Sequence, residues 1–190
     1  MSSASEPSTM SASATASPGG KRAFGIATHR SPAAFAERIP LCESSTAVHS
    51  AGSLKAFVHQ MNHEAGKLKL SDTHYSNPSG IVDAGNHSSA WDVADLSRQV
   101  LAVAPLRRLV SSKFYRPATG APYVNRNELL WTYPDAGGIK TGQTTLAGNC
   151  LAASATRGGH TLIAVELGVQ GSEFAAASRM LDWGFHEVAR

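Results

Sequence analysis

The pattern of apolar and polar positions changes near residue 50 and divides the chain in two. Up to residue 49 the sequence is rich in Ser, Ala, Thr and Pro, and neither helical nor alternating periodicity persists. Such a composition buries little apolar surface, so we predict that residues 1–49 form a disordered segment. Residues 50–190 carry the periodic patterns of a folded domain.

Three amphipathic helices are predicted in this domain. Ser53, Ser89 and Ser172 each precede a run of apolar positions and can cap a helix there. The apolar positions repeat every three or four residues and are Leu54, Phe57, Val58, Met61 and Ala65 in the first helix, Val93, Leu96, Val100 and Val103 in the second, and Phe174, Ala177, Leu181, Phe185 and Val188 in the third. This spacing places one stripe of each helix against a core.

Two mostly apolar runs, residues 146–155 and 161–167, predict adjacent strands. The stretch Thr156-Arg-Gly-Gly-His160 between them is typical of a hairpin connection. Residues 114–133 are polar and turn-rich. The end of the chain therefore combines a strand hairpin with a closing helix.

Composition and charge exclude several classes of protein. The 190 residues carry a net charge of +3, and the basic residues are scattered along the sequence, so no nucleic-acid footprint is indicated. No stretch is long enough to span a membrane. The start lacks the basic and apolar regions of a signal peptide, so the chain as written is expected in the cytoplasm. Two cysteines, Cys42 and Cys150, make no disulfide framework, and Cys150 is expected to be a small buried hydrophobe.

A metal site is not predicted. His59 and His63 have the spacing of the His-Glu-x-x-His zinc motif, but Gln60 stands where that motif has its Glu. No third ligand is positioned by the sequence, so we predict neither metal nor cofactor. Trp131 and Trp183 are expected to be core aromatics.

Lys140-Thr-Gly142 is the strongest candidate for binding chemistry. Lys140 would place a fixed cation beside a substrate carboxylate, and Thr141 offers that carboxylate a hydroxyl. Gly142 has no side chain to hold a substrate backbone away, and the preceding Gly137-Gly138 is expected to leave the strand edge open. A peptide could then dock there as an added strand.

A nucleophile is not found in the sequence. No lysine has a serine three residues before it, and no asparagine has a serine two residues before it. Acyl transfer needs a serine with a base within hydrogen-bond reach. No catalytic residue is therefore identified.

Six segments after residue 50 stand in a distinctive order: Phe57-Val-His-Gln-Met-Asn62, Thr73-His-Tyr-Ser-Asn-Pro-Ser-Gly80, His87-Ser-Ser-Ala-Trp-Asp92, Asn125-Arg-Asn-Glu-Leu-Leu130, Gly138-Ile-Lys-Thr-Gly142 and Ala147-Gly148. In this order and spacing they resemble the D-alanyl-D-alanine carboxypeptidases, the low-molecular-mass penicillin-binding proteins of serine peptidase family S11. Only the second part of the family's catalytic domain is matched. The family's Ser-x-x-Lys and Ser-x-Asn motifs are missing, and Ser79 and Ile81 replace the His and Leu that the family has there.

The resemblance implies an α/β (α+β) fold, namely part of a β-lactamase/transpeptidase-like architecture in which helices flank an antiparallel sheet. It implies a serine-type hydrolase that trims peptidoglycan stem peptides through an acyl-enzyme. The implied partners are D-Ala-D-Ala stem peptides and β-lactams on the extracytoplasmic side. The implied substrate-binding residues are Lys140, Thr141 and Gly142.

Three hypotheses fit this combination. We favour a truncated or misread family member, inactive alone, in which residues 1–49 come from a wrong reading frame or start site. The second hypothesis is a non-catalytic module that binds D-alanyl peptides or a protein partner. The third is one half of a split enzyme whose nucleophile lies on another chain.

Overall fold

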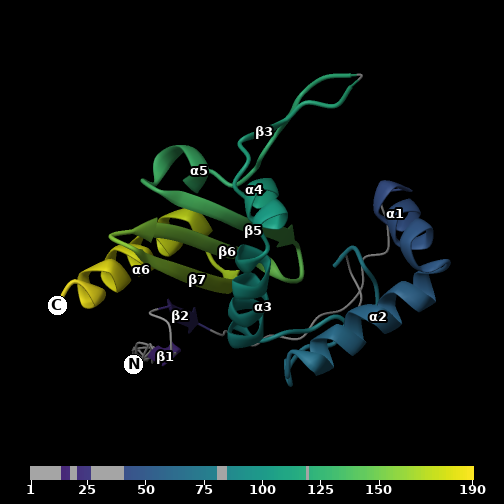
Figure 1. The fold of residues 1–190 in the computed structure, drawn as a ribbon, viewed down its shortest axis with the longest axis horizontal. Helices are drawn as coiled ribbons and strands as arrows, with labels where there is room; N and C mark the ends of the chain where they lie inside the picture. The colour runs from purple at the N-terminus through teal and green to yellow at the C-terminus, as the bar shows by residue number, and fades with distance from the viewer. Residues whose placement is uncertain (1–13, 18–20, 27–40, 81–84, 119) are drawn as a thin grey trace, which may run out of the picture.

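The computed structural model describes residues 14–17, 21–26, 41–80, 85–118 and 120–190. A five-stranded sheet in the order β1-β2-β7-β6-β5 forms its centre, with helices on both faces (Figure 1). The strands are β1 (Ala14–Ser17), β2 (Lys21–Ile26), β5 (Ala136–Thr144), β6 (Gly148–Arg157) and β7 (His160–Val169). The three strands from the C-terminal half pair antiparallel, and β6 and β7 form the predicted hairpin.

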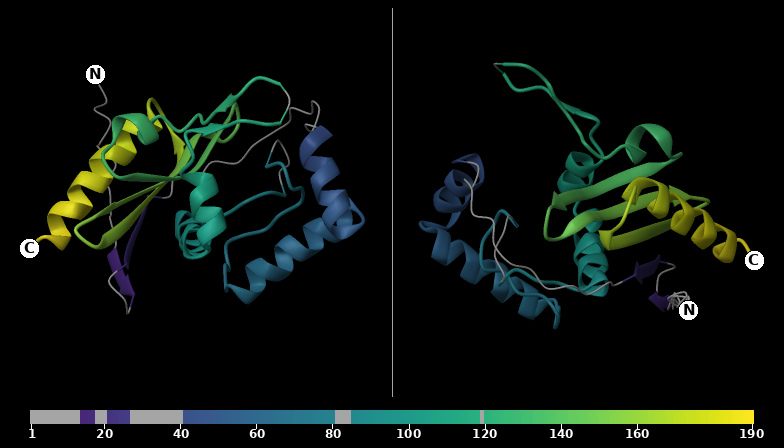
Figure 2. Two further views of the ribbon diagram at one scale, coloured as in Figure 1. Left: turned by 45° about the horizontal axis from the view of Figure 1, so that its top comes forward. Right: turned by 180° about the vertical axis from the view of Figure 1, so that it is seen from behind.

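Two helices cover the two faces of the sheet. Helix α6 (Glu173–Val188) packs on one face, which is turned toward the viewer on the right of Figure 2, and α3 (Ala90–Ala102) packs on the other. The core under α6 contains Leu129, Leu151, Leu162, Leu181 and Phe185. The core under α3 is smaller and contains Ala90, Ala94, Ala152, Ile163 and Val165.

The three predicted helix starts are confirmed. Ser53 Oγ accepts a hydrogen bond from Ala56 N at 3.1 Å at the start of α2 (Leu54–Lys67). Ser89 and Ser172 cap α3 and α6 in the same way, each at 3.2 Å. Each serine satisfies one of the amide donors that a helix leaves unpaired at its first turn.

The buried stripe of α3 differs in part from the predicted one. Its buried residues are Ala90, Asp92, Ala94 and Ser97. Of the predicted residues, Val93 is partly buried and packs against the core under α3, whereas Val103 is 47% exposed. A further helix, α4 (Ala104–Val110), follows and has Pro105 in its first turn.

The remaining elements lie around this sheet. Helices α1 (Leu41–Ala51) and α2 pack together to one side of the sheet (Figures 1 and 2). Strands β3 (Phe114–Tyr115) and β4 (Tyr123–Val124) form a projecting hairpin, which is followed by the short helix α5 (Leu129–Thr132).

β1, β2 and most of α1 lie within residues 1–49, the segment for which the sequence predicts disorder. β1 pairs with β2, and β2 pairs parallel with β7. That residues 1–49 form a disordered segment stays a prediction. Residues 1–13, 18–20 and 27–40 lie outside the described part.

Three side chains predicted to be buried are only partly so. Trp131 is 43% exposed and Trp183 is 45% exposed, so neither is a core aromatic. Trp131 instead contacts Phe114 edge to face, with ring centroids 6.0 Å apart. Cys150 is half-buried, and its Sγ accepts a hydrogen bond from Gly168 N at 3.4 Å.

Candidate functional site

Strand β5 carries Lys140-Thr-Gly142 and is the last strand of the sheet. One of its edges pairs with β6, where Lys140 lies opposite Ala152 and Gly142 opposite Cys150. Its other edge pairs with no strand in the described residues. Where that edge is not covered by another element, its backbone donors and acceptors can pair with an added strand.

Gly137 and Gly138 position this strand in a way that sequence reasoning missed. A Cβ on Gly138 would lie 2.8 Å from the carbonyl oxygen of Val110 at the end of α4. A Cβ on Gly137 would lie 2.9 Å from Ser154 Oγ on β6. The two glycines therefore allow close contact with α4 and β6. That they also leave the strand edge open stays a prediction.

Gly142 has different surroundings. A Cβ there would meet only Cys150 Cβ, at 3.8 Å, which is ordinary van der Waals contact. The fold therefore has room for a side chain at residue 142. A glycine there matters for what approaches the strand from outside.

Lys140 presents a cation at the strand edge. The residue is exposed, and its Nζ donates a hydrogen bond to the carbonyl oxygen of Thr141. In the part of the chain that the structure describes, no carboxylate forms an ion pair with Lys140. Thr141 is half-buried beside it. An anionic group reaching this edge would meet an uncompensated positive charge.

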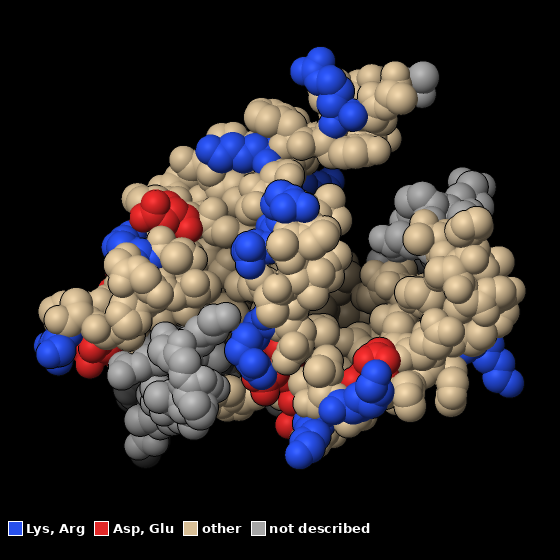
Figure 3. Space-filling view, viewed as in Figure 1, with Lys and Arg blue, Asp and Glu red and all other residues tan. Residues whose placement is uncertain are grey.

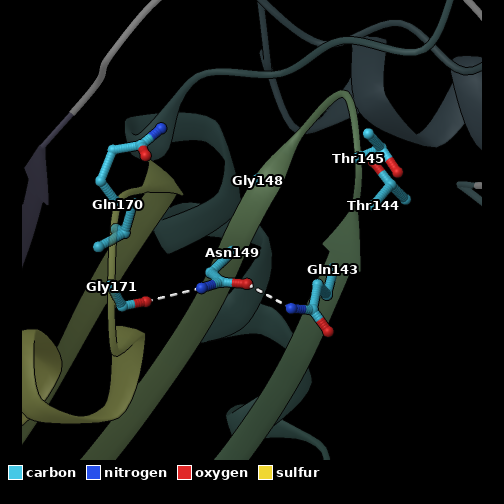
Figure 4. A pocket seen from close by; sticks show the side chains of 8 residues that line it. Gln143, Thr144, Thr145, Gly148, Asn149, Gln170 and Gly171 are labelled. Carbon is cyan, nitrogen blue, oxygen red and sulfur yellow. Dashed lines mark hydrogen bonds between the residues drawn. The ribbon is translucent and has the colours of Figure 1, made fainter.

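A polar pocket of about 480 Å³ lies at the end of β5 (Figure 4). Asn149 joins two of its walls, because its Oδ1 accepts from Gln143 Nε2 at 2.8 Å and its Nδ2 donates to Gly171 O at 2.6 Å. The lining is uncharged and consists of Gln143, Thr144, Thr145, Gly148, Asn149, Val169, Gln170 and Gly171. Amides and hydroxyls of this kind suit an uncharged polar ligand.

The sequence-predicted residues lie beside this pocket but do not line it. Gln143 follows Gly142 directly along β5, whereas Lys140 and Thr141 are absent from the lining. Figure 3 shows a hollow between the surface of α4 and the pair formed by α1 and α2. That Lys140 and Thr141 face an open groove stays a prediction.

Asn62 fastens α2 to the loop that follows it. Its Nδ2 donates to Tyr75 O at 2.7 Å, and its Oδ1 accepts from Tyr75 N at 2.8 Å. The neighbouring His74 forms an isolated bridge with His87, through two backbone hydrogen bonds of 2.9 and 3.0 Å. Asn62 and the bridge between His74 and His87 therefore shape the loop between α2 and α3.

Asp92 holds the same loop from the start of α3. Its carboxylate is 7% exposed and accepts hydrogen bonds from Asp72 N at 2.8 Å and Thr73 Oγ1 at 2.7 Å. Thr73 Oγ1 also pairs with Ser88 Oγ at 2.8 Å. A carboxylate in the first turn of a helix is further favoured by the helix dipole.

Asn125 and Asn127 hold the chain between the β3–β4 hairpin and α5 through side-chain hydrogen bonds to the backbone. Asn125 Nδ2 donates to Ser112 O at 3.0 Å, and its Oδ1 accepts from Asn127 N at 3.0 Å. The Oδ1 of Asn127 accepts from Leu129 N at 3.1 Å at the start of α5. This helix then places Leu129 in the core that supports β5 and β6.

Glu166 is a buried acid on β7 that the sequence did not single out. It is 3% exposed, and its Oε2 has no hydrogen-bond partner within the described residues. Burial raises the pKa of Glu166 from 4.5 to about 7, while Arg179 opposes the rise and Glu173 adds to it. The folded chain therefore binds this proton more tightly than the unfolded chain does.

We expect Glu166 to make the folded state less stable as pH rises from about 4.5 to about 7. Across that window the folded chain holds a proton that the unfolded chain has lost, so the free energy of unfolding falls. Glu166→Gln should remove this decline and stabilise the fold by ~1–3 kcal/mol at pH 8. Urea unfolding between pH 4 and pH 8 measures the effect.

Glu128→Gln, the same change at an exposed position, is the matched control and should leave the profile unchanged. A wild-type profile that is flat, or that rises with pH and is unaltered by Glu166→Gln, would contradict this account of Glu166.

Two kinds of feature are missing from the described residues. No three His, Cys, Asp or Glu side chains lie close enough together there to hold a metal ion. Within the same residues, none of the helices combines the length and the apolar character needed to cross a bilayer.

Comparisons of the sequence with known proteins point to one family. The sequence model of Peptidase S11, D-alanyl-D-alanine carboxypeptidase, matches residues 44–171. D-alanyl-D-alanine carboxypeptidase DacD of Escherichia coli (strain K12) is 39% identical over 137 residues, which cover 70% of this chain and 35% of the relative. D-alanyl-D-alanine carboxypeptidase DacF of Bacillus subtilis (strain 168) is 34% identical over 142 residues, which cover 72% of this chain and 36% of the relative. The chain thus spans about a third of the length of these relatives.

Solved structures agree with this match. Penicillin binding protein 6B from Escherichia coli superposes with a TM-score of 0.69 at 38% identity, over 75% of this chain and 46% of that one. D-alanyl-D-alanine carboxypeptidase from Mycobacterium tuberculosis gives a TM-score of 0.70 at 28% identity, and the match covers 75% of this chain and 58% of that one. The predicted fold class, a transpeptidase/β-lactamase-like sheet flanked by helices, is confirmed.

Proposed function

Because this chain belongs to the D-alanyl-D-alanine carboxypeptidase family, we propose that its residues 50–190 bind a D-alanyl peptide along β5 without hydrolysing it. The family acts on the bacterial cell wall. The observation that carries the proposal is the unpaired edge of β5, where Lys140 is exposed and has no carboxylate partner among the described residues. Residues 1–49 lie outside the proposed binding domain.

The peptide would bind as a further strand beside β5. Main-chain hydrogen bonds to the open edge supply affinity that does not depend on sequence. The ammonium of Lys140 and the hydroxyl of Thr141 would hold the terminal carboxylate, because charge-assisted hydrogen bonds are stronger than neutral ones. Gly142 leaves space for the peptide backbone, and the uncharged pocket after Gln143 suits the amide groups of a stem peptide.

Hydrolysis would need an activated serine, and we propose that this chain has none. No Ser-x-x-Lys pair occurs in the sequence. Several serines have other roles: Ser53 and Ser89 cap helices, Ser88 bonds to Thr73, and Ser112 Oγ donates to Arg108 O at 2.6 Å. Without a neighbouring base a serine hydroxyl is a weak nucleophile.

We expect the purified chain to form no covalent adduct with a fluorescent penicillin and to release no D-alanine from a D-alanyl-D-alanine peptide. It should still bind such a peptide reversibly, and more weakly as salt is added, because the main charge contact is exposed. Lys140→Ala should weaken binding on the order of tenfold. Titration calorimetry measures binding, and gel fluorescence detects an adduct.

Lys55→Ala, which removes an exposed cation from α2, is the control and should leave peptide affinity unchanged. A penicillin adduct that survives denaturation and maps to one serine would contradict the proposal that the chain does not hydrolyse its ligand. The role of β5 would be overturned if the chain bound no peptide, or if Lys140→Ala bound the peptide as tightly as the wild type does. Labelling that returns only when a second polypeptide with a Ser-x-x-Lys motif is added would favour a split enzyme instead.

A further inference from the structure

The hairpin formed by residues 113–126 carries apolar side chains that the fold leaves uncovered. It projects away from the sheet above α4 (Figure 1). Phe114 and Tyr115 are each 60% exposed, Tyr123 is 68% exposed and Val124 is 59% exposed. Phe114 lies opposite Val124, and Tyr115 lies opposite Tyr123. Successive side chains of a strand alternate between faces, so both faces of this ribbon are apolar.

The base of the hairpin is fixed by defined contacts. Asn125 N donates to Lys113 O at 2.9 Å, and Asn125 Nδ2 donates to Ser112 O at 3.0 Å. Phe114 packs edge to face on Trp131, and Lys113 Nζ lies 5.9 Å from the centroid of the Trp131 ring. The ribbon is therefore held at its base while its apolar side chains remain in solvent.

The same region concentrates positive charge. Residues 96–127 contain no Asp or Glu. Lys113, Arg116 and Arg126 lie on the hairpin, and Arg107 and Arg108 lie on α4 at its base; none of these five forms an ion pair within the described residues. Figure 3 shows Lys and Arg, without Asp or Glu, on the hairpin and α4. The basic residues are thus scattered in sequence but gathered in space.

We propose that this hairpin docks on an anionic lipid surface. Aromatic side chains with a polar tip favour the boundary between lipid and water, and neighbouring Lys and Arg side chains are attracted by anionic headgroups. The exposed Leu106 and Leu109 of α4 extend the apolar surface at the base of the hairpin. This surface lies outside the β5 edge, so the proposal does not depend on peptide binding.

The geometry favours lipid over single-stranded nucleic acid, which is also bound by aromatic and basic side chains. Tyr115 and Tyr123 stack on each other, with ring centroids 6.3 Å apart and planes inclined by 26°. The two rings thus lie beside each other and leave no gap wide enough for a base to insert between them. Exposed aliphatic residues such as Val124 gain contacts in a lipid interface, whereas base stacking makes no use of them.

Cosedimentation of the full chain with lipid vesicles tests the proposal. The chain should bind phosphatidylcholine vesicles that contain phosphatidylglycerol and bind pure phosphatidylcholine far less. Arg116→Gln/Arg126→Gln should weaken binding on the order of tenfold. Tyr115→Ala/Tyr123→Ala should weaken it by a similar factor, because the apolar contact is lost. All four side chains are exposed, so the circular dichroism spectrum and the melting temperature should not change.

Lys55→Gln/Lys67→Gln removes two exposed cations from α2 and is the matched charge control, which should bind as the wild type does. The proposal is wrong if the chain ignores anionic vesicles, if the hairpin variants bind like the wild type, or if the control loses as much affinity as they do. Binding of a single-stranded oligonucleotide without vesicle binding would assign the hairpin to nucleic acid instead.

Discussion

Gly138→Ala is expected to destabilise the fold by ~2–4 kcal/mol. The added Cβ would lie 2.8 Å from the carbonyl oxygen of Val110, which is backbone and cannot rotate away. Gly138 also has φ +117°, a conformation that L-residues rarely adopt. Strand β5 would have to move away from α4, and the contact between the two elements would be lost. Urea unfolding followed by far-ultraviolet circular dichroism measures the change.

Gly142→Ala is the matched control on the same strand. Its Cβ would meet only Cys150 Cβ at 3.8 Å, so stability should change by less than about 0.5 kcal/mol. The two variants separate the glycine that the fold needs from the one that we assign to ligand approach. Equal stability of the two variants would contradict the close packing of β5 on α4.

Asp92→Ala should cost ~1–3 kcal/mol, because it leaves the partly buried donors Asp72 N and Thr73 Oγ1 without the buried carboxylate that accepts from them. The loop between α2 and α3 would loosen as well, since Asp92 joins it to the start of α3. Thermal and urea unfolding measure the loss of stability, and hydrogen exchange at residues 72–75 measures the loosening.

Asp95→Ala is the control one turn further along α3. Asp95 is exposed and pairs with Arg98 at 3.4 Å, and surface ion pairs of this kind contribute about 0–1 kcal/mol. If Asp92→Ala and Asp95→Ala cost the same, the carboxylate of Asp92 does not hold the loop as described.

The sequence predicts the positions of helices better than their buried sides. Serine caps and apolar periodicity located the starts of α2, α3 and α6 correctly. In α3, however, periodicity selected large residues up to the exposed Val103, and of these only Val93 packs beside Ala90 and Ala94 in the core under α3. A hydrophobicity pattern cannot distinguish a small residue in close contact from a small residue in solvent, because that depends on the distance to the neighbouring layer.

The sequence likewise predicted one part of the candidate site and missed another. Lys140-Thr-Gly142 was found because its three residues are consecutive and suggest a chemistry. The polar pocket was missed, since it forms from residues that are distant in sequence, such as Asn149 and Gly171. The role of Gly138 was also missed, because the carbonyl oxygen that requires a glycine belongs to Val110 on another element.

The open edge of β5 has a consequence for the behaviour of the chain in solution. An edge that can accept a peptide strand can equally accept the edge of a second copy, and repeated pairing of this kind leads to aggregation. An exposed lysine on such an edge opposes it, because a neighbouring copy would bring its own lysine into repulsive contact. Lys140 would then keep the strand soluble while it is empty, so a variant without this charge has to be handled at low concentration.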